Sequence, residues 1–221
     1  MPAPGQFILN KQVIPSELRS REWEAARVDY WRMERAFVMA GKVRFEDAQA
    51  CRNAAAALAN GKVSLIEARR AVREELERAG YRPTPGTTGT IKDIYTPRRL
   101  DVTLKTNVNM ARGYAEKNRL TGNAMYPASE LHRNRQSREP RDWQMRWNEA
   151  AASVNYEGVA RDGSFIALND SPIWAALSRW RTPYPPFDYG SGMWWRPVKW
   201  RVAEQKGLVT DEDMELSLIH I

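Results

Sequence analysis

Three polar residues near the carboxyl end come closest to a reactive constellation in this sequence. Asp188, Ser191 and Arg196 lie among tryptophans and tyrosines in the segment PYPPFDYGSGMWWRPVKW. A few polar side chains in an apolar wall are the usual composition of a ligand site. These residue types could therefore form a polar pocket, and this interpretation has to be weighed against a purely structural one.

The same segment carries the residues of a rigid turn. Pro185 and Pro186 restrict the backbone, whereas Gly190 and Gly192 permit the positive φ that tight turns use. Aromatic side chains around them supply apolar area to anchor the turn. We therefore interpret the segment as a loop that packing holds in shape, and we expect alanine at Asp188 or Ser191 to be tolerated.

Residues suited to metal binding or nucleophilic catalysis are few. The two histidines, His132 and His220, have no carboxylate or second histidine at metal-ligand spacing, and the only cysteine is Cys51. We expect His132 on a helix surface and Cys51 as a small buried residue. The motifs of phosphate-binding loops, dinucleotide-binding turns and esterase nucleophiles do not occur. The sequence thus predicts no metal, no cofactor and no catalytic centre.

The formal net charge of +7 would attract a polyanion. From Arg19 to Arg78, however, the basic residues are interspersed with acidic ones, and Arg73 and Glu77 stand four apart, as in a helical ion pair. A solvated helix face is the favoured interpretation, and an arm that tracks phosphates is the alternative. No apolar run is long enough to span a membrane, and the start MPAPGQFILN does not have the pattern of a signal peptide, so we expect a cytoplasmic protein.

Helical spacing dominates residues 1–80. Apolar residues recur at intervals of three and four from Ser16 to Ala40, and a second helix is expected from Phe45 to Leu58, before Asn60-Gly61. A third helix begins after Ser64, which with Glu67 has the spacing of a capping box, and runs to Gly80. We expect residues 1–80 to form a helical arm or small bundle.

The composition changes at residues 81–96. This stretch, which begins YRPTPGTTGT, is rich in proline, glycine and threonine and is expected to be a linker. A long helix should follow from Pro97, capped by Thr96, to about Asn118, and its apolar residues should face the core of a second domain. Those residues are Leu100, Leu104, Val108 and Ala111, with Thr106 and Asn107 in buried or capping hydrogen bonds.

The second domain is expected to cover residues 97–209 and to mix helices with short strands. Proline-initiated helices are predicted at Pro127–Gln136 and Pro140–Ala152, and a buried strand at Phe165–Leu168. A short helix should follow Pro172, and loops with short strands should lead to a helical turn before Gly207. The fold class is therefore α+β, predominantly helical. Residues 210–221 end in MELSLIHI, which we interpret as a tail that is truncated or not native.

Three stretches in order resemble the phage Mu F-like head-morphogenesis family of minor capsid proteins. They are TNVNMARGYAEKN from Thr106, YPASELHRNRQSREPRDWQMRW from Tyr126 with FIALNDSPIWAAL from Phe165, and PYPPFDYGSGMWWRPV from Pro183. The resemblance covers roughly residues 80–208. Its motif residues are Thr106, Asn107, Ala111, Gly113, Tyr114, Pro140, Trp143, Trp147, Pro172, Trp174, Pro185, Pro186, Phe187, Ser191, Gly192 and Met193.

The resemblance implies an N-terminal helical arm followed by a compact Mu F-like domain. It also implies a minor head protein that acts in procapsid assembly near the portal vertex. Its partners would be portal and capsid or scaffold proteins, with packaged DNA as a further, electrostatic contact. Such a protein would be in the host cytoplasm during assembly and in the virion head afterwards. The family's other branch ends in a histidine and a cysteine-arginine-cysteine turn, and this chain has no cysteine or histidine in that region, so metal binding is not transferred.

Two functions of other classes compete with the structural one. A sequence-independent nucleic-acid-binding module would use the basic residues between Arg19 and Arg78. A toxin- or enzyme-associated domain is the third hypothesis. It is the least favoured, because a chain of 221 residues leaves no unassigned stretch that is large enough for a catalytic domain.

Overall fold

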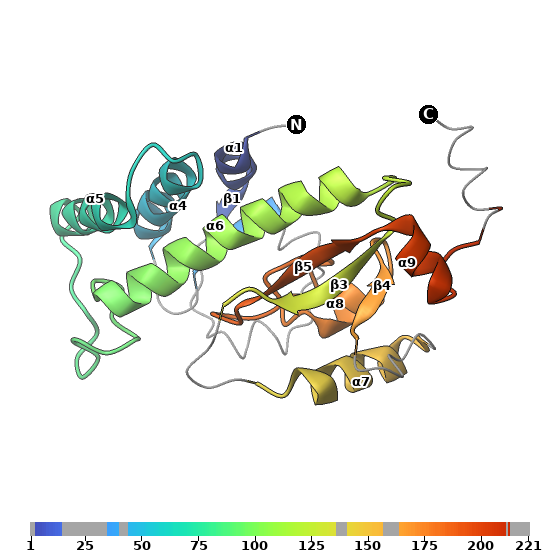
Figure 1. The fold of residues 1–221 in the computed structure, drawn as a ribbon. Coiled ribbons are helices and arrows are strands. Elements are labelled where there is room, and N and C mark those ends of the chain that lie inside the picture. Colours follow the sequence, from blue (N-terminus) through green and yellow to red (C-terminus); the bar gives the residue numbers. More distant parts are fainter. Residues whose placement is uncertain are drawn as a thin grey trace. The chain divides into compact units, whose positions relative to one another are not determined.

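The computed structural model describes residues 3–14, 35–39, 44–135, 141–156, 164–210 and 212. The chain divides into two compact units, Met1–Arg112 and Gly113–Ile221, and each is described by itself. Helices and short strands are both present, with helix predominating (Figure 1), which is compatible with the predicted α+β class. The division falls within helix α6 (Pro97–Leu120), later than the segment 81–96 in which the sequence suggested a linker. No helix in the described ranges is long and apolar enough to cross a membrane.

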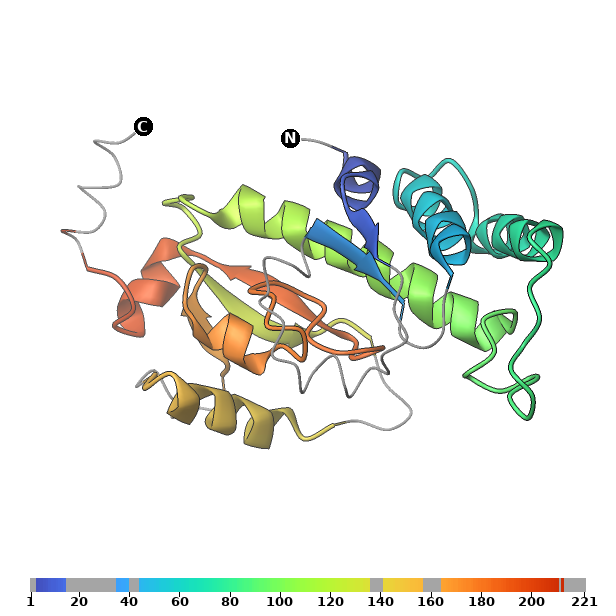
Figure 2. The same ribbon diagram turned by 180° about the vertical axis from the view of Figure 1, so that it is seen from behind.

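The first unit begins with a short helix and two paired strands. Helix α1 (Pro4–Leu9) leads into β1 (Gln12–Ile14), which pairs in parallel with β2 (Ala36–Val38), as Figure 2 shows. The helix predicted over residues 16–40 is therefore wrong at its end, because pairing with β1 places Phe37 in a strand and buries it fully. Tertiary pairing here outweighs the helical spacing. Residues 16–34 lie outside the described part of the chain.

The next two helices agree with the prediction. Helix α4 (Phe45–Ala59) ends at Asn60, and Gly61 follows it with a φ of 69°. Helix α5 (Leu65–Arg78) starts with the predicted capping box: the Ser64 backbone N–H donates to the Glu67 carboxylate at 2.6 Å, and the Glu67 N–H donates to the Ser64 hydroxyl at 3.3 Å. These signals are local to the chain, which is why the sequence locates them well.

Residues 81–96 are a series of turns organised by one carboxylate. Asp93 is buried and accepts hydrogen bonds from the Tyr81 hydroxyl and from the backbone N–H groups of Gly89 and Tyr95. Ile94 packs in the apolar cluster of the first unit. The segment is therefore part of the packed structure of that unit.

Helix α6 starts at Pro97, as predicted, with the Arg99 N–H donating to the Thr96 hydroxyl at 3.3 Å. The four apolar residues expected to face a core are indeed buried. The core is a different one, however, because Leu100, Leu104 and Ala111 pack with residues of α4 and α5 in the first unit. Asn107 donates to the backbone carbonyl of Thr103 at 3.0 Å, and Thr106 is half-buried.

The second unit is built on a three-stranded antiparallel sheet in the order β4-β3-β5 (Figure 1), formed by Ile166–Leu168, Ala128–Arg133 and Met193–Val198. Its helices are α7 (Trp143–Ser153), α8 (Ile173–Leu177) and α9 (Trp200–Gln205). The predicted strand near Phe165–Leu168, the helix after Pro172 and the helical turn before Gly207 are confirmed. Helix α7 is capped by Asp142, and Pro140 lies outside the described residues.

The helix predicted at Pro127–Gln136 is wrong, because this segment is the central strand β3. Ala128, Ser129 and Leu131 are buried within the sheet, and β3 pairs along its whole length with β5. Proline fixes φ near a value that suits an extended chain as well as a helix start, so Pro127 alone did not discriminate between them. His132 consequently lies on this strand, opposite Trp194, and not on a helix surface.

Aromatic residues from distant segments form the core of the second unit. Trp174 of α8 is the centre: its ring lies 5.5 Å from that of Trp147, 5.7 Å from that of Phe187 and 5.2 Å from that of Trp195. Its indole N–H donates to the Leu168 carbonyl at 2.8 Å. The cluster joins α7, α8 and β5 to the segment before β5, which is where the candidate site lies.

Candidate functional site

The segment from Pro183 to Met193 is held in place by contacts of its backbone and of its aromatic side chains. The Pro185-Pro186 bond is cis, and a Cβ on Gly113 of α6 would overlap the Pro185 carbonyl oxygen. Phe187 is fully buried, and the ring of Tyr184 makes an edge-on contact with Tyr114 at 5.8 Å. Packing on both sides therefore fixes the approach to the turn.

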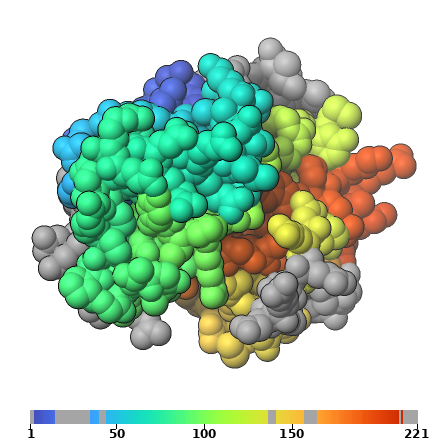
Figure 3. Space-filling view, turned by 90° about the vertical axis from the view of Figure 1, so that its left-hand side faces the viewer, coloured from blue at the N-terminus to red at the C-terminus, as the bar shows by residue number. Residues whose placement is uncertain are grey.

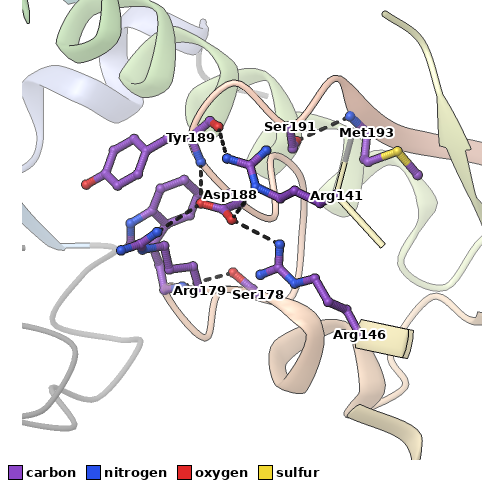
Figure 4. A network of polar contacts seen from close by, with 9 residues as sticks. Arg141, Arg146, Ser178, Arg179, Asp188, Tyr189, Ser191 and Met193 are labelled. Atoms are coloured by element: carbon purple, nitrogen blue, oxygen red, sulfur yellow. Dashed lines mark hydrogen bonds and ion pairs between the residues drawn. The ribbon is translucent and has the colours of Figure 1, made fainter. Parts of the chain in front are cut away.

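Asp188, in the middle of this segment, is the centre of an ion-pair network (Figure 4). Its Oδ2 lies 3.1 Å from Nε of Arg141 and 2.9 Å from Nη1 of Arg146, and its Oδ1 lies 3.4 Å from Nη1 of Arg179. The backbone N–H of Tyr189 also donates to Oδ1, at 2.7 Å. The Asp188 side chain is only 6% exposed, so charge-assisted bonds replace its hydration.

The three arginines come from separate parts of the chain. Arg141 precedes α7 and also donates to the Tyr189 carbonyl at 2.9 Å, whereas Arg146 lies on α7. Arg179 follows α8, and its backbone N–H donates to the Phe187 carbonyl at 3.0 Å. One carboxylate thus connects the turn to both helices of the aromatic core.

Aromatic rings support the same guanidinium groups. Arg146 lies over the ring of Trp143 at 4.6 Å, and Arg179 lies over the ring of Tyr189 at 5.4 Å. The Tyr189 ring in turn contacts Trp180 edge-on at 4.9 Å. Such stacking restricts the arginine rotamers and so lowers the entropic cost of the ion pairs.

Ser191 and Ser178 hold backbone turns. The Ser191 hydroxyl accepts from the Met193 N–H at 3.2 Å, and the Ser191 N–H donates to the Asp188 carbonyl at 3.3 Å. Ser178 accepts from the Trp180 N–H at 3.2 Å and shares a hydrogen bond with Thr182. Both hydroxyl groups therefore stabilise local turns of the backbone.

The pocket considered from the sequence does not form as such. Asp188 and Ser191 are neighbours, but Arg196 lies on β5 and pairs with Glu130 of β3 at 2.5 Å. The structure also argues against the expectation that alanine at Asp188 is tolerated, because removing a buried carboxylate leaves its three arginine partners without their shared anion. Arg141, Arg146 and Arg179 were not among the predicted site residues. Each stands one or two positions before a tryptophan, in RDW, MRW and SRW, and this recurrence is the signal that could have found them.

Several of the remaining motif residues are buried in the aromatic core or make close contacts beside the turn. Pro172 directly precedes α8, and Trp143, Trp147, Trp174 and Met193 are buried in the aromatic core. Gly192 has a φ of 67°, and a Cβ there would overlap the Arg135 carbonyl oxygen. Most of the motif residues in the second unit thus lie in the turn or in the aromatic core beside it, whereas Thr106, Asn107 and Ala111 belong to the first unit and Pro140 lies outside the described residues.

Two groups with shifted pKa values lie away from the turn. Cys51 is fully buried, which confirms the prediction that it is a small buried residue, and this burial raises the pKa of its thiol to about 12. Burial also raises the pKa of Tyr156 to about 12, and its hydroxyl donates to the Ile166 carbonyl at 2.8 Å. Both groups stay protonated at neutral pH. Across the ranges that the structure describes, no three His, Cys, Asp or Glu residues gather as metal ligands.

The network around Asp188 is suited to fixing the conformation of the turn. The carboxylate is bound to three arginines, and the hydroxyl groups of Ser178 and Ser191 accept hydrogen bonds from the backbone. No family model, curated protein or solved structure matches this chain.

Proposed function

We propose that this chain is a structural protein of phage head assembly, a minor head protein of the Mu F-like kind, without a catalytic centre of its own. Its partners would be portal and capsid or scaffold proteins, first in the host cytoplasm and then in the virion. The ordered motifs of the sequence are the basis of the proposal. The observation that carries it is the Asp188 network, in which the charged residue of the segment from Pro183 to Met193 fixes a turn.

The role of Asp188 separates a structural from a catalytic interpretation. A general base or nucleophile needs a carboxylate that can reach a substrate. Asp188 is instead enclosed, with both oxygens bound to guanidinium groups and one also to a backbone N–H. An assembly protein benefits from such a rigid loop, because a preformed surface loses little entropy when it binds a partner.

The proposal can be tested with heads assembled in cells. The full chain, tagged, is produced together with the portal and capsid proteins that the proposal requires in the same genome, and particles are purified and analysed by mass spectrometry. We expect the wild-type chain and Glu130→Ala, which removes an exposed ion pair, in the particles. Asp188→Ala should be depleted from them, because the turn loses its anchor.

Two results would contradict the proposal. One is an absence of the wild-type chain from particles that assemble normally and contain portal protein. The other is an enzymatic activity of the purified chain that Asp188→Ala or Ser191→Ala abolishes while thermal unfolding stays unchanged. The second result would make the turn a functional site in its own right.

A sequence-independent contact with nucleic acid is the second candidate, and the distribution of charge favours it. Met1–Arg112 contains twenty Lys and Arg against thirteen Asp and Glu, whereas Gly113–Ile221 contains fourteen of each. The whole surplus of +7 therefore belongs to the first unit. If it serves nucleic acid, binding of a labelled duplex should weaken steeply between about 50 and 200 mM salt, because neutralised phosphates release counterions. Undetectable binding at low salt would exclude this candidate.

A further inference from the structure

A hollow of about 370 Å³ lies beside helix α5 in the first unit. Helix α5 supplies most of its wall, and Tyr95 and Pro97 complete it. Atoms of α5 and of the segment after it form the surface in the foreground of Figure 3. The volume is within the range of sites that bind small molecules or a few side chains. The lining residues are Ile66, Arg69, Arg70, Arg73, Glu74, Glu77, Tyr95 and Pro97.

The three arginines of the hollow are not equally neutralised. Arg69 pairs with Asp101 of α6 at 3.3 Å, and Asp101 also pairs with Lys105 at 3.0 Å. Neither Arg70 nor Arg73 has a carboxylate oxygen within ion-pair distance in the described part of the chain, although Arg70 is close enough to Glu67 for its charge to help lower the pKa of that carboxyl. The sequence suggested an ion pair between Arg73 and Glu77. In the structure, Arg73 instead lies over the Tyr95 ring, 4.2 Å from its centroid. The guanidinium groups of Arg70 and Arg73 are thus available to an anionic partner.

Apolar and acidic residues in the same wall indicate what kind of anionic partner would fit. Ile66 is 67% exposed, an unusual position for a large aliphatic side chain, and Tyr95 and Pro97 add apolar area. Glu74 and Glu77 line the same wall and would repel any anion placed against them, so a continuous run of phosphates fits poorly. A peptide fits better, because it can place single carboxylates against Arg70 and Arg73, away from the two glutamates, and an aliphatic side chain against Ile66.

We infer that this hollow is a docking site for an acidic peptide segment that carries aliphatic side chains, on a partner protein. Carboxylates of the segment pair with Arg70 and Arg73, and a leucine-like side chain covers Ile66 and Pro97. The inference does not depend on the proposed role in head assembly, since it rests only on the hollow and its lining.

The test uses the full chain and three fluorescein-labelled peptides, built from the repeats Glu-Glu-Leu, Glu-Glu-Ser and Gln-Gln-Leu, together with a labelled DNA duplex. Fluorescence anisotropy measures binding. The Glu-Glu-Leu peptide should bind most tightly. Arg70→Gln should weaken it by about five- to tenfold, as expected for one charge-assisted hydrogen bond at a partly exposed site. Ile66→Ser should weaken it by about the same factor and leave the duplex unaffected.

Arg98→Gln is the matched control, because it removes one exposed positive charge from the same unit outside the hollow. Both Arg70 and Ile66 are exposed, so thermal unfolding of these variants should be unchanged. An equal loss in Arg98→Gln would overturn the inference in favour of diffuse attraction. Duplex binding that depends on Arg70 while no peptide binds would assign the hollow to nucleic acid. Failure of every probe to bind, or no effect of Ile66→Ser, would also overturn it.

Discussion

Gly113 of α6 lies directly against the carbonyl group of Pro185, so closely that a Cβ on the glycine would overlap the Pro185 oxygen. The two residues are far apart in sequence, and the contact brings the long helix and the turn around Asp188 together within the second unit. It gives a physical reason for a glycine in a helix interior, where glycine is otherwise unfavourable.

Gly113→Ala should therefore destabilise the protein, although alanine is the better helix former. We expect a loss of about 1 to 3 kcal/mol from overpacking, against a gain of about 1 kcal/mol from helix propensity. The control is Asn118→Ala on the exposed side of the same helix, which should not lower stability. Urea unfolding measures both. A stabilising Gly113→Ala would show that α6 and the turn can separate at no cost.

Asp188→Ala should be among the most destabilising single changes at a charged residue of the second unit. It leaves three guanidinium groups without their shared anion, and we expect a cost of about 3 kcal/mol, the lower end for buried pairs because the arginines remain partly hydrated. Glu130→Ala, which breaks the exposed pair with Arg196, should cost about 0 to 1 kcal/mol. Similar midpoints in urea for the two variants would refute the anchoring role of Asp188.

Local signals were predictable from the sequence and contacts between distant segments were not. The capping box of Ser64 and Glu67, the start of α6 at Pro97 and the burial of Cys51 each depend on a few neighbouring residues. Strand β3 was read as a helix because its state depends on β4 and β5, which follow later in the chain. The partners of Asp188 were missed for the same reason, since Arg146 is 42 residues away.

A comparison of Gly190 with Gly192 separates two causes of lost stability, the steric overlap of a new side chain and the positive φ of the backbone. Both have positive φ, but nothing lies near the Cβ position of Gly190, whereas that of Gly192 overlaps the Arg135 carbonyl. Alanine at either position pays about 1 kcal/mol for the left-handed backbone. Gly192→Ala should cost about 1 to 3 kcal/mol more, and Gly192→Val more again. Equal unfolding temperatures for the two alanine variants would mean that the Arg135 segment yields without strain.

The buried thiol of Cys51 should make stability depend on pH in the alkaline range. Burial raises its pKa from 9.0 to about 12, whereas in the unfolded chain the thiol ionises near its ordinary value. Between these two values the unfolded state loses a proton that the folded state keeps. The contribution of the thiol to stability is therefore intact below the ordinary value and is lost as pH rises through this window, by about 1.4 kcal/mol per pH unit.

The comparison with Cys51→Ala isolates this effect, because all other titrating groups are common to both proteins. Alanine leaves a small cavity and lowers stability at every pH, but it should not change the slope. Between about pH 8 and pH 10.5, under reducing conditions, the free energy of unfolding of the wild type should fall by about 2 kcal/mol more than that of Cys51→Ala. Parallel pH profiles would show that the thiol ionises as readily in the folded protein as in the unfolded chain, and hence that water reaches Cys51 between α4 and its neighbours.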